Sequence, residues 1–146
     1  MEEKIKEDLK QSQLAKDALK VSTLRMLLSE MKYAQIKKGD ELTDEDVVSV
    51  VQREIKKRQE SIEAFEKAGR SEMAENEKAE TEILKTYLPP QMSEEEVSRL
   101  VDEAVVETGA TSAADMGKVI GLVMKKVGQA APGSVVSALV KQKLTS

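Results

Sequence analysis

Few residues in this chain can interrupt a helix. Its 146 residues include 7 glycines and 3 prolines, and the stretches between them are dominated by residues with high helix propensity. Apolar residues recur at helical spacing and not at the two-residue period of a half-buried strand. The sequence therefore predicts an all-α protein.

The pair Pro89–Pro90 is the strongest predicted boundary in the chain, because proline ends a helix and disfavours helical conformation in the residue before it. We expect an N-terminal helical domain over 1–90, built from long helices. A small three-helix bundle should fill 91–146. The first stretch of the N-terminal domain is predicted to be one long helix, or two helices with a break near 12–16.

Polar residues at the predicted helix starts indicate N-caps, whose side chains accept hydrogen bonds from the first free backbone N–H groups. The predicted caps are Thr43 with Asp46, Ser71, Ser93 with Glu96, and Ser112 with Asp115.

Composition excludes several classes of chemistry. The chain has no cysteine and no histidine, which removes the commonest ligands of transition metals and the commonest general base. No phosphate-binding loop or nucleophile elbow is present. We therefore expect no metal, no cofactor and no independent catalysis. The charged amino terminus, "MEEKIKEDLK", lacks an apolar leader, and no apolar run approaches the ~20 residues that span a bilayer. The expectation is a cytoplasmic protein with no membrane partner.

The distribution of charge is more informative than the total of −4. Residues 91–111 contain six acids and one arginine, whereas residues 112–146 contain five lysines and one aspartate. A segment of net charge −5 is thus followed by one of +4. Local charge decides where a polyanion can dock, so the last segment is the candidate surface.

Within that segment, "DMGKVIGLVMKKVG" (115–128) places two glycines inside a predicted helix. Each costs about 0.5–1 kcal/mol relative to alanine. On a helical wheel the apolar residues form one buried arc, which contains Met116, Val119, Ile120, Val123 and Val127. Gly117 and Gly121 fall outside that arc, on the side of Lys118 and Lys125. Lys126 lies at the edge of the arc.

Two interpretations of this strip remain open. Another helix of the same protein could pack closely over the small residues. Alternatively, the backbone of a nucleic acid could approach there while the lysines neutralise its phosphates. No aromatic residue follows Tyr87, so any RNA bound here should be structured RNA and not a strand with stacked single bases. The candidate RNA-binding residues are Gly117, Lys118, Gly121, Lys125 and Lys126.

A second basic stretch, "REIKKRQES", places Arg53, Lys56, Lys57 and Arg58 on one predicted helix. With Glu54 and other nearby acids it predicts a solvated, salt-bridged helix face. A secondary phosphate contact is the alternative. Arg25, which lies among apolar residues, is expected to pair with an acid across the helix bundle.

The residues "AGR", "YLP", "SEEE" and "DMGKVIG" occur in an order that resembles the YqeY-like family over nearly the whole chain. Residues 91–146 also resemble the tail domain of the B subunit of glutamine-dependent aspartyl/glutamyl-tRNA amidotransferase. In that enzyme the tail is a helical module that helps to hold tRNA, and the amidation occurs elsewhere. Family members tend to read Lys-Gly-Arg-Ala-Asp-Gly in the next loop, whereas this chain has "GQAAPG" at 128–133.

The resemblance implies a stand-alone tRNA-binding module associated with glutamine-dependent amidation, a carbon–nitrogen ligase reaction whose catalytic subunits this chain does not resemble. Its expected partners are tRNA and an amidotransferase or an aminoacyl-tRNA synthetase. The alternative is a helical scaffold for protein–protein interaction that binds no RNA.

Overall fold

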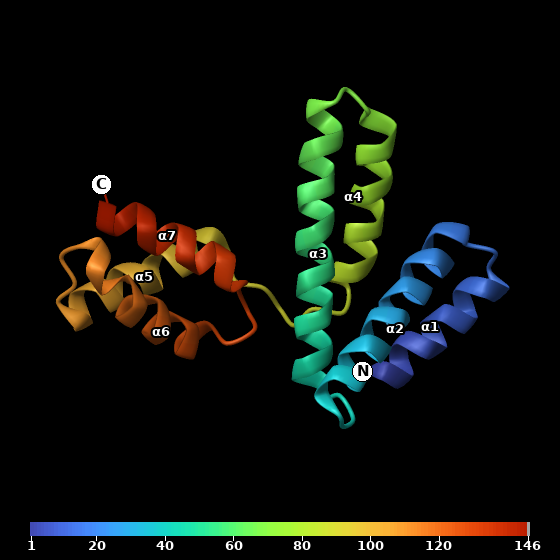
Figure 1. The fold of residues 1–146 in the computed structure, drawn as a ribbon, viewed down its shortest axis with the longest axis horizontal. Helices are drawn as coiled ribbons and strands as arrows, with labels where there is room; N and C mark the ends of the chain where they lie inside the picture. Colours follow the sequence, from blue (N-terminus) through green and yellow to red (C-terminus); the bar gives the residue numbers. More distant parts are fainter. Residues whose placement is uncertain (146) are drawn as a thin grey trace. The chain divides into compact units, whose positions relative to one another are not determined.

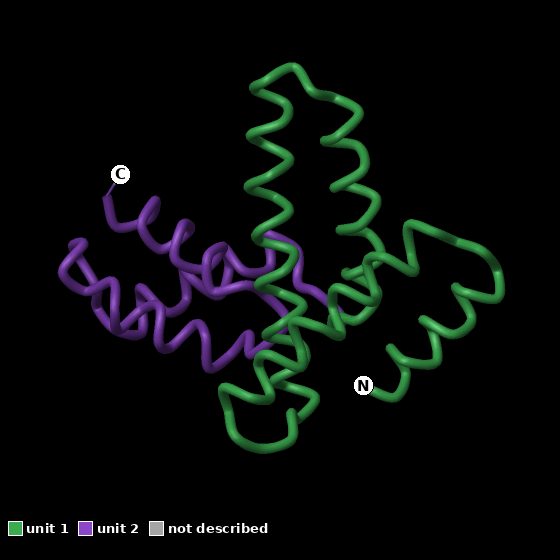
Figure 2. The backbone as a smooth tube through the Cα atoms, turned by 45° about the vertical axis from the view of Figure 1, so that its right-hand side comes forward, with its two compact units in different colours: residues 1–88 green, residues 89–146 purple. Residues whose placement is uncertain are grey.

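The computed structural model describes residues 1–145, and the regular structure in that range is entirely helical (Figure 1). The helices are α1 (Glu2–Leu14), α2 (Ala18–Lys38), α3 (Asp44–Lys67), α4 (Ser71–Lys85), α5 (Glu94–Thr108), α6 (Met116–Val127) and α7 (Gly133–Thr145), with a 3₁₀ turn, η1 (Ala113–Asp115), before α6. The prediction of an all-α protein is confirmed for the described residues. The chain divides into two compact units, residues 1–88 (unit 1) and residues 89–146 (unit 2), coloured separately in Figure 2.

Unit 1 consists of two helix pairs, α1 with α2 and α3 with α4 (Figure 1). The first stretch forms two helices because the chain turns at Lys16, the one described non-glycine residue with a positive φ, +56°. The Asp17 carboxylate then caps α2 by accepting a hydrogen bond from the Lys20 backbone N–H at 3.1 Å. The buried core of the unit consists of Ile5, Leu24, Leu27, Met31, Val47, Val50, Val51, Ile55, Leu84 and Tyr87.

The ends of unit 1 are joined by a hydrogen bond between residues far apart in the sequence. The Tyr87 hydroxyl, just after α4, donates to the Asp8 carboxylate of α1 at 2.6 Å. Burial and this bond to a carboxylate raise the pKa of Tyr87, because both disfavour the phenolate. The contact holds α1 against the end of α4.

Two of the four predicted caps have the expected geometry. Thr43 and Ser93 each form a complete capping box at the start of α3 and α5. The prediction for Ser71 is wrong, because the turn after α3 is so short that Ser71 is already the first residue of α4.

The predicted cap at Ser112 and Asp115 is also wrong. Residues 113–115 form a 3₁₀ turn, and the Asp115 carboxylate accepts a hydrogen bond from the Thr111 backbone N–H at 3.1 Å. The same spacing of residues therefore supports a loop here and a capping box at Ser93.

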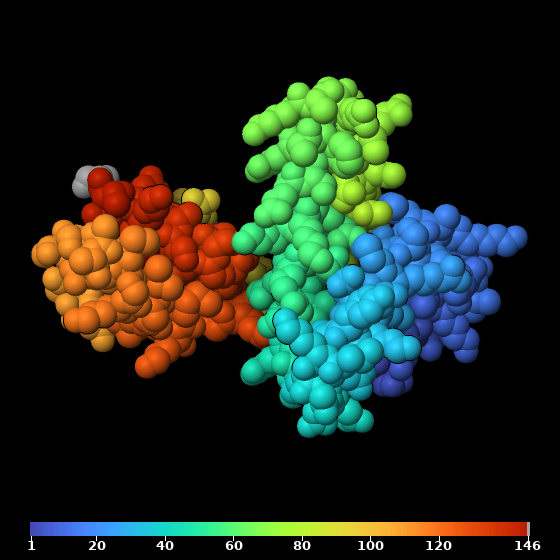
Figure 3. Space-filling model, in the orientation of Figure 1, coloured from blue at the N-terminus to red at the C-terminus, as the bar shows by residue number. Residues whose placement is uncertain are grey.

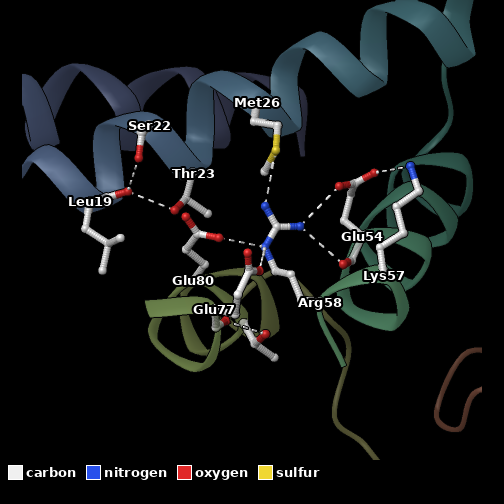
Figure 4. A network of polar contacts seen from close by, with 10 residues as sticks. Leu19, Ser22, Thr23, Met26, Glu54, Lys57, Arg58, Glu77 and Glu80 are labelled. Carbon is white, nitrogen blue, oxygen red and sulfur yellow. Dashed lines mark hydrogen bonds and ion pairs between the residues drawn. The ribbon is translucent and has the colours of Figure 1, made fainter. Parts of the chain in front are cut away.

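Arg58 lies in a buried network that links three helices of unit 1 (Figure 4). Its side chain is 6% exposed, and its Nη1 donates to the Glu54 carboxylate at 3.1 Å on the same helix. Its Nε donates to Glu80 of α4 at 3.2 Å, and its Nη2 lies 3.3 Å from the Met26 sulfur of α2. The prediction of a solvated, salt-bridged face is therefore wrong for Arg58 and Glu54, both of which are buried.

Glu77 of α4 is the least favourably placed carboxylate of this network. Its nearest contact with Arg58 Nε is 4.0 Å. Burial and the neighbouring charge of Glu80 raise the pKa of Glu77 above its ordinary value of 4.5. The folded state thus disfavours ionised Glu77 relative to the unfolded chain.

Replacing Glu77 with glutamine is expected to remove a pH-dependent destabilisation. Because the pKa of Glu77 is raised in the folded state, protonated Glu77 favours folding. This contribution to the free energy of unfolding is fully present below the unfolded pKa and is lost as pH rises through the folded pKa. Urea unfolding at mildly acidic and at neutral pH should show Glu77→Gln gaining stability over the wild type only at neutral pH. The control is Glu82→Gln, an exposed residue of the same helix. An equal gain in the control, or no gain at neutral pH, would contradict the role of burial.

Unit 2 is a bundle of α5, α6 and α7 around a second core, which is rich in valine. The buried residues of this core are Val97, Val101, Ala104, Val119, Val123, Val127, Ala131, Val136, Leu139 and Val140. The segment after Pro90 is fastened to the loop between α6 and α7, because the Met92 backbone N–H donates to the Ala130 carbonyl at 2.8 Å.

Candidate nucleic-acid interface

The apolar arc predicted for α6 is buried against the rest of unit 2. Val119, Val123 and Val127 are 0–5% exposed, while Gly117 and Gly121 lie on the exposed side of the helix. The wheel therefore assigned the two faces of α6 correctly. It did so because burial along a regular helix follows its period of 3.6 residues.

No other helix among the described residues of unit 2 covers the glycines. A Cβ atom built at Gly117 or at Gly121 would meet no heavy atom within 4 Å. The interpretation of the strip as a packing site for another helix is therefore wrong for the described helices of unit 2. Alanine would fit at both positions and would favour the helix, so neither local geometry nor packing within unit 2 explains these glycines.

The three lysines beside the strip differ in their surroundings. Lys118 and Lys125 are exposed, and neither forms an ion pair or a side-chain hydrogen bond with any described residue. Lys126 pairs with Glu107 of α5 at 3.3 Å, which the sequence did not indicate. Lys118 and Lys125 are thus the cations of the strip that are free to meet an anion.

The helix dipole separates these lysines further. Lys125 and Lys126 lie in the last turn of α6, where a cation is favourable by about 0.3–1 kcal/mol. Lys118 is the third residue of the helix, near the positive end of the dipole, where a cation is unfavourable. Helix stability therefore accounts for the last-turn lysines but not for Lys118.

The loop after α6 has a structural role in unit 2. Gln91 donates from its side-chain amide to the Gln129 carbonyl at 3.1 Å, and Ala131 is buried. Gly128, which ends α6, has a φ of +54°. The loop "GQAAPG" thus uses its backbone to hold the segment that follows Pro90.

The candidate secondary basic face lies on α3, in unit 1. Arg53 and Lys56 are exposed and have no ion-pair partner among residues 1–145. Lys57 pairs with the buried Glu54 at 3.2 Å. This face therefore offers two free cations and not three.

Residues 1–145 contain neither a cluster of metal ligands nor a helix that could cross a membrane. No group of three or more acidic side chains in this range is arranged to hold a metal ion. None of the helices in this range combines the length and apolar character that crossing a bilayer requires.

The fold and the α6 strip define the class of protein, an all-α protein of two helical units with an open glycine–lysine helix face in the second. The chain belongs to the family described as Yqey-like protein, whose family model matches residues 2–144.

Several curated relatives share the name "Altered inheritance of mitochondria protein 41, mitochondrial". The protein of Lachancea thermotolerans is 38% identical over 106 residues, covering 70% of this chain and 57% of its own length. That of Eremothecium gossypii is 32% identical over 113 residues, covering 75% of this chain and 62% of its own length. The Pyrenophora tritici-repentis protein is 31% identical over 144 residues, covering 95% and 78%. The chain thus spans about three fifths of the length of the first two.

These names contradict the prediction of a cytoplasmic protein, because each of the three relatives is named as mitochondrial. That prediction was based on the lack of an apolar leader. Such a leader marks secretion, whereas mitochondrial targeting segments are amphipathic and rich in arginine and serine. The lack of an apolar leader therefore does not assign a protein to the cytoplasm.

Proposed function

We propose that this chain is a tRNA-binding module that acts with a glutamine-dependent tRNA amidotransferase or a related RNA enzyme. The observation that carries the proposal is the uncovered strip of α6. Gly117 and Gly121 leave room for the backbone of a nucleic acid to approach α6. Lys118 and Lys125, which have no ion-pair partner among the described residues, lie beside them.

The chemistry of the strip favours structured RNA. Contacts between lysine side chains and phosphates position a protein on a nucleic acid but do not read its base sequence. RNA helices are recognised largely by shape, phosphates and 2′-hydroxyls. Unit 2 contains no aromatic residue on which a single base could stack. The resemblance of residues 91–146 to the tail domain of the amidotransferase B subunit supports tRNA as the particular RNA.

The test is a gel shift with bulk tRNA over a range of salt concentrations. The affinity of the wild type should fall as salt rises, because binding releases the counterions of the neutralised phosphates. In Lys118→Glu/Lys125→Glu we expect weaker binding and a salt slope that is smaller by about 1 for each lost phosphate contact.

The control is Lys4→Glu/Lys10→Glu, which changes the net charge equally at two exposed lysines of α1 that have no ion-pair partner among the described residues. Its salt slope should match that of the wild type. No binding to tRNA at low salt would rule out the proposal, and equal loss in both double variants would show that total charge, and not the strip, is responsible.

A protein-interaction scaffold is the second candidate, and the exposed apolar side chains favour it. Val106 of α5 is 82% exposed and Leu14 of α1 is 70% exposed. A pull-down after nuclease treatment distinguishes the two functions. A defined partner retained without RNA and lost in Val106→Asp would favour the scaffold, whereas a partner lost with the RNA would favour the tRNA-binding module.

A further inference from the structure

Helix α2 is strongly basic in an otherwise acidic protein. It contains five cations and one acid, a net charge of +4, whereas the whole chain has a net charge of −4. The cations are Lys20, Arg25, Lys32, Lys37 and Lys38, and the acid is Glu30. Of the five, Lys38 alone has an ion-pair partner among residues 1–145, Asp46 at 2.5 Å.

The buried side of α2 packs on the other helices of unit 1 through Leu24, Leu27 and Met31. The opposite side stays open, and side chains of α2 are visible in the lighter blues at the surface in Figure 3. We call this side the α2 outer face; its exposed residues include Arg25, Lys32, Tyr33, Ile36 and Lys37. The prediction that Arg25 pairs with an acid across the bundle is wrong, since no described residue pairs with it.

Tyr33 is the exposed aromatic residue of the chain. It is 67% exposed, whereas Tyr87 is buried and Phe65 is half-buried. Its hydroxyl has no hydrogen-bond partner among the described residues. Lys37 follows one helical turn later on the same side, where residues four apart are neighbours. An open aromatic ring thus lies among unpaired cations.

The positive surface continues from α2 onto α3. Lys37 and Arg53 line the same groove between these two helices, together with the apolar Ala34 and Val50 and the Lys38–Asp46 ion pair. Arg53, proposed from the sequence as part of a secondary basic face, therefore extends the α2 outer face.

We propose that the α2 outer face binds single-stranded nucleic acid, with a base stacked on Tyr33 and the flanking phosphates on Arg25, Lys32 and Lys37. Aromatic platforms among cations are the usual means of holding single strands without sequence preference. The proposal goes beyond the tRNA contact on α6, because it concerns a different unit and a ligand with unpaired bases.

A membrane surface suits this face less well. Amphipathic helices that lie in a bilayer present a broad apolar side, whereas the α2 outer face offers Ile36, 69% exposed, and one tyrosine ring. The open π-face of Tyr33 is the feature that distinguishes a base from an acidic peptide as the ligand.

The chain contains two tyrosines and no tryptophan, so intrinsic tyrosine fluorescence reports directly on the platform. Titration of the full chain with oligouridylate too short to fold should quench Tyr33. The buried Tyr87 should be unaffected. In Tyr33→Phe, a labelled oligouridylate should bind with near wild-type affinity, but the quenching should vanish. In Tyr33→Ala, affinity should fall on the order of ten-fold.

Charge variants complete the test. Arg25→Ala/Lys32→Ala should reduce the salt slope by about 0.7 for each phosphate contact, whereas Lys4→Ala/Lys10→Ala, at exposed and unpaired lysines of α1, should not. Circular dichroism checks that each variant is folded. The Lys118→Glu/Lys125→Glu variant should bind oligouridylate normally, so this proposal and the tRNA proposal can fail separately.

Three results would overturn the proposal. The first is no binding of oligouridylate at low salt, and the second is oligouridylate binding that Tyr33→Ala leaves unchanged. The third is that the chain binds anionic phospholipid vesicles and not the oligonucleotide, and that this vesicle binding depends on Tyr33 and Arg25.

Discussion

Replacing Arg58 with alanine is expected to destabilise unit 1 by about 3–5 kcal/mol. The change removes the cation that contacts Glu54 at 3.1 Å and Glu80 at 3.2 Å. Glu54 is 4% exposed and would lose its buried partner. The exposed Lys57 at 3.2 Å would remain as its partner, and a buried charge that loses its buried partner is more costly than a missing surface pair.

The size of the effect should depend on what replaces each member of the pair. Arg58→Lys should be intermediate, because a lysine cannot reproduce the planar fork that reaches both helices. Arg58→Met/Glu54→Leu should recover most of the lost stability, since replacing both charges with apolar groups of similar volume is often neutral or favourable.

Urea unfolding followed by tyrosine fluorescence measures this effect in the right part of the chain. Both tyrosines lie within residues 1–88, so the signal reports on unit 1 alone. Arg53→Ala is the matched control, because Arg53 lies on the same helix but is exposed and unpaired, and it should change stability by less than about 0.5 kcal/mol. Equal midpoints for the two alanine variants would mean that the Arg58 network contributes no stability.

Gly117→Ala/Gly121→Ala is expected to stabilise unit 2 while weakening tRNA binding. Each alanine should add about 0.5–1 kcal/mol of stability, because its Cβ meets nothing within 4 Å in the free protein. If an RNA backbone lies on the strip, the same methyl groups keep it away from α6. We expect affinity to fall roughly ten-fold, equivalent to about 1.4 kcal/mol.

The glycine variant leaves every charge in place, so its tRNA affinity should fall with no change in salt slope. That result differs from the one expected for the lysine variants. Unfolding of unit 2 has to be followed by circular dichroism, because the unit contains no aromatic residue. Gly109→Ala is the contrasting control. Gly109 has a φ of +66°, so alanine there should be destabilising by about 1–2 kcal/mol.

A stabilised glycine variant with wild-type tRNA affinity would exclude the strip as the contact surface. A variant that is not stabilised would instead show that the free protein constrains these positions.

Features that depend on local periodicity were largely predictable. The helical wheel placed Val119 and Val123 in the core of unit 2 and Gly117 outside it, as the structure does. The capping boxes at Thr43 and Ser93 were read correctly from spacing alone. Spacing failed at Asp115, where a 3₁₀ turn takes the place of the first helical turn.

Features that depend on neighbours distant in the sequence were not predictable. Arg53 and Arg58 lie on the same helix, yet one is exposed and the other is 5% exposed, because α2 and α4 meet only one side of α3. Glu107 neutralises Lys126 from another helix. Tyr33 and Lys37 belong to one exposed surface because the remaining helices of unit 1 pack on the other side of α2.

From sequence alone this chain is determined to be helical, and the buried arc of α6 is determined as well, since a helix repeats every 3.6 residues and its apolar side follows that period. The tertiary structure alone decided that the described residues of unit 2 leave the glycine strip uncovered and Lys118 and Lys125 unpaired, and that Arg58 is buried in unit 1. The physical reason is that coverage and ion pairing depend on which helices come together, and no local spacing encodes that arrangement.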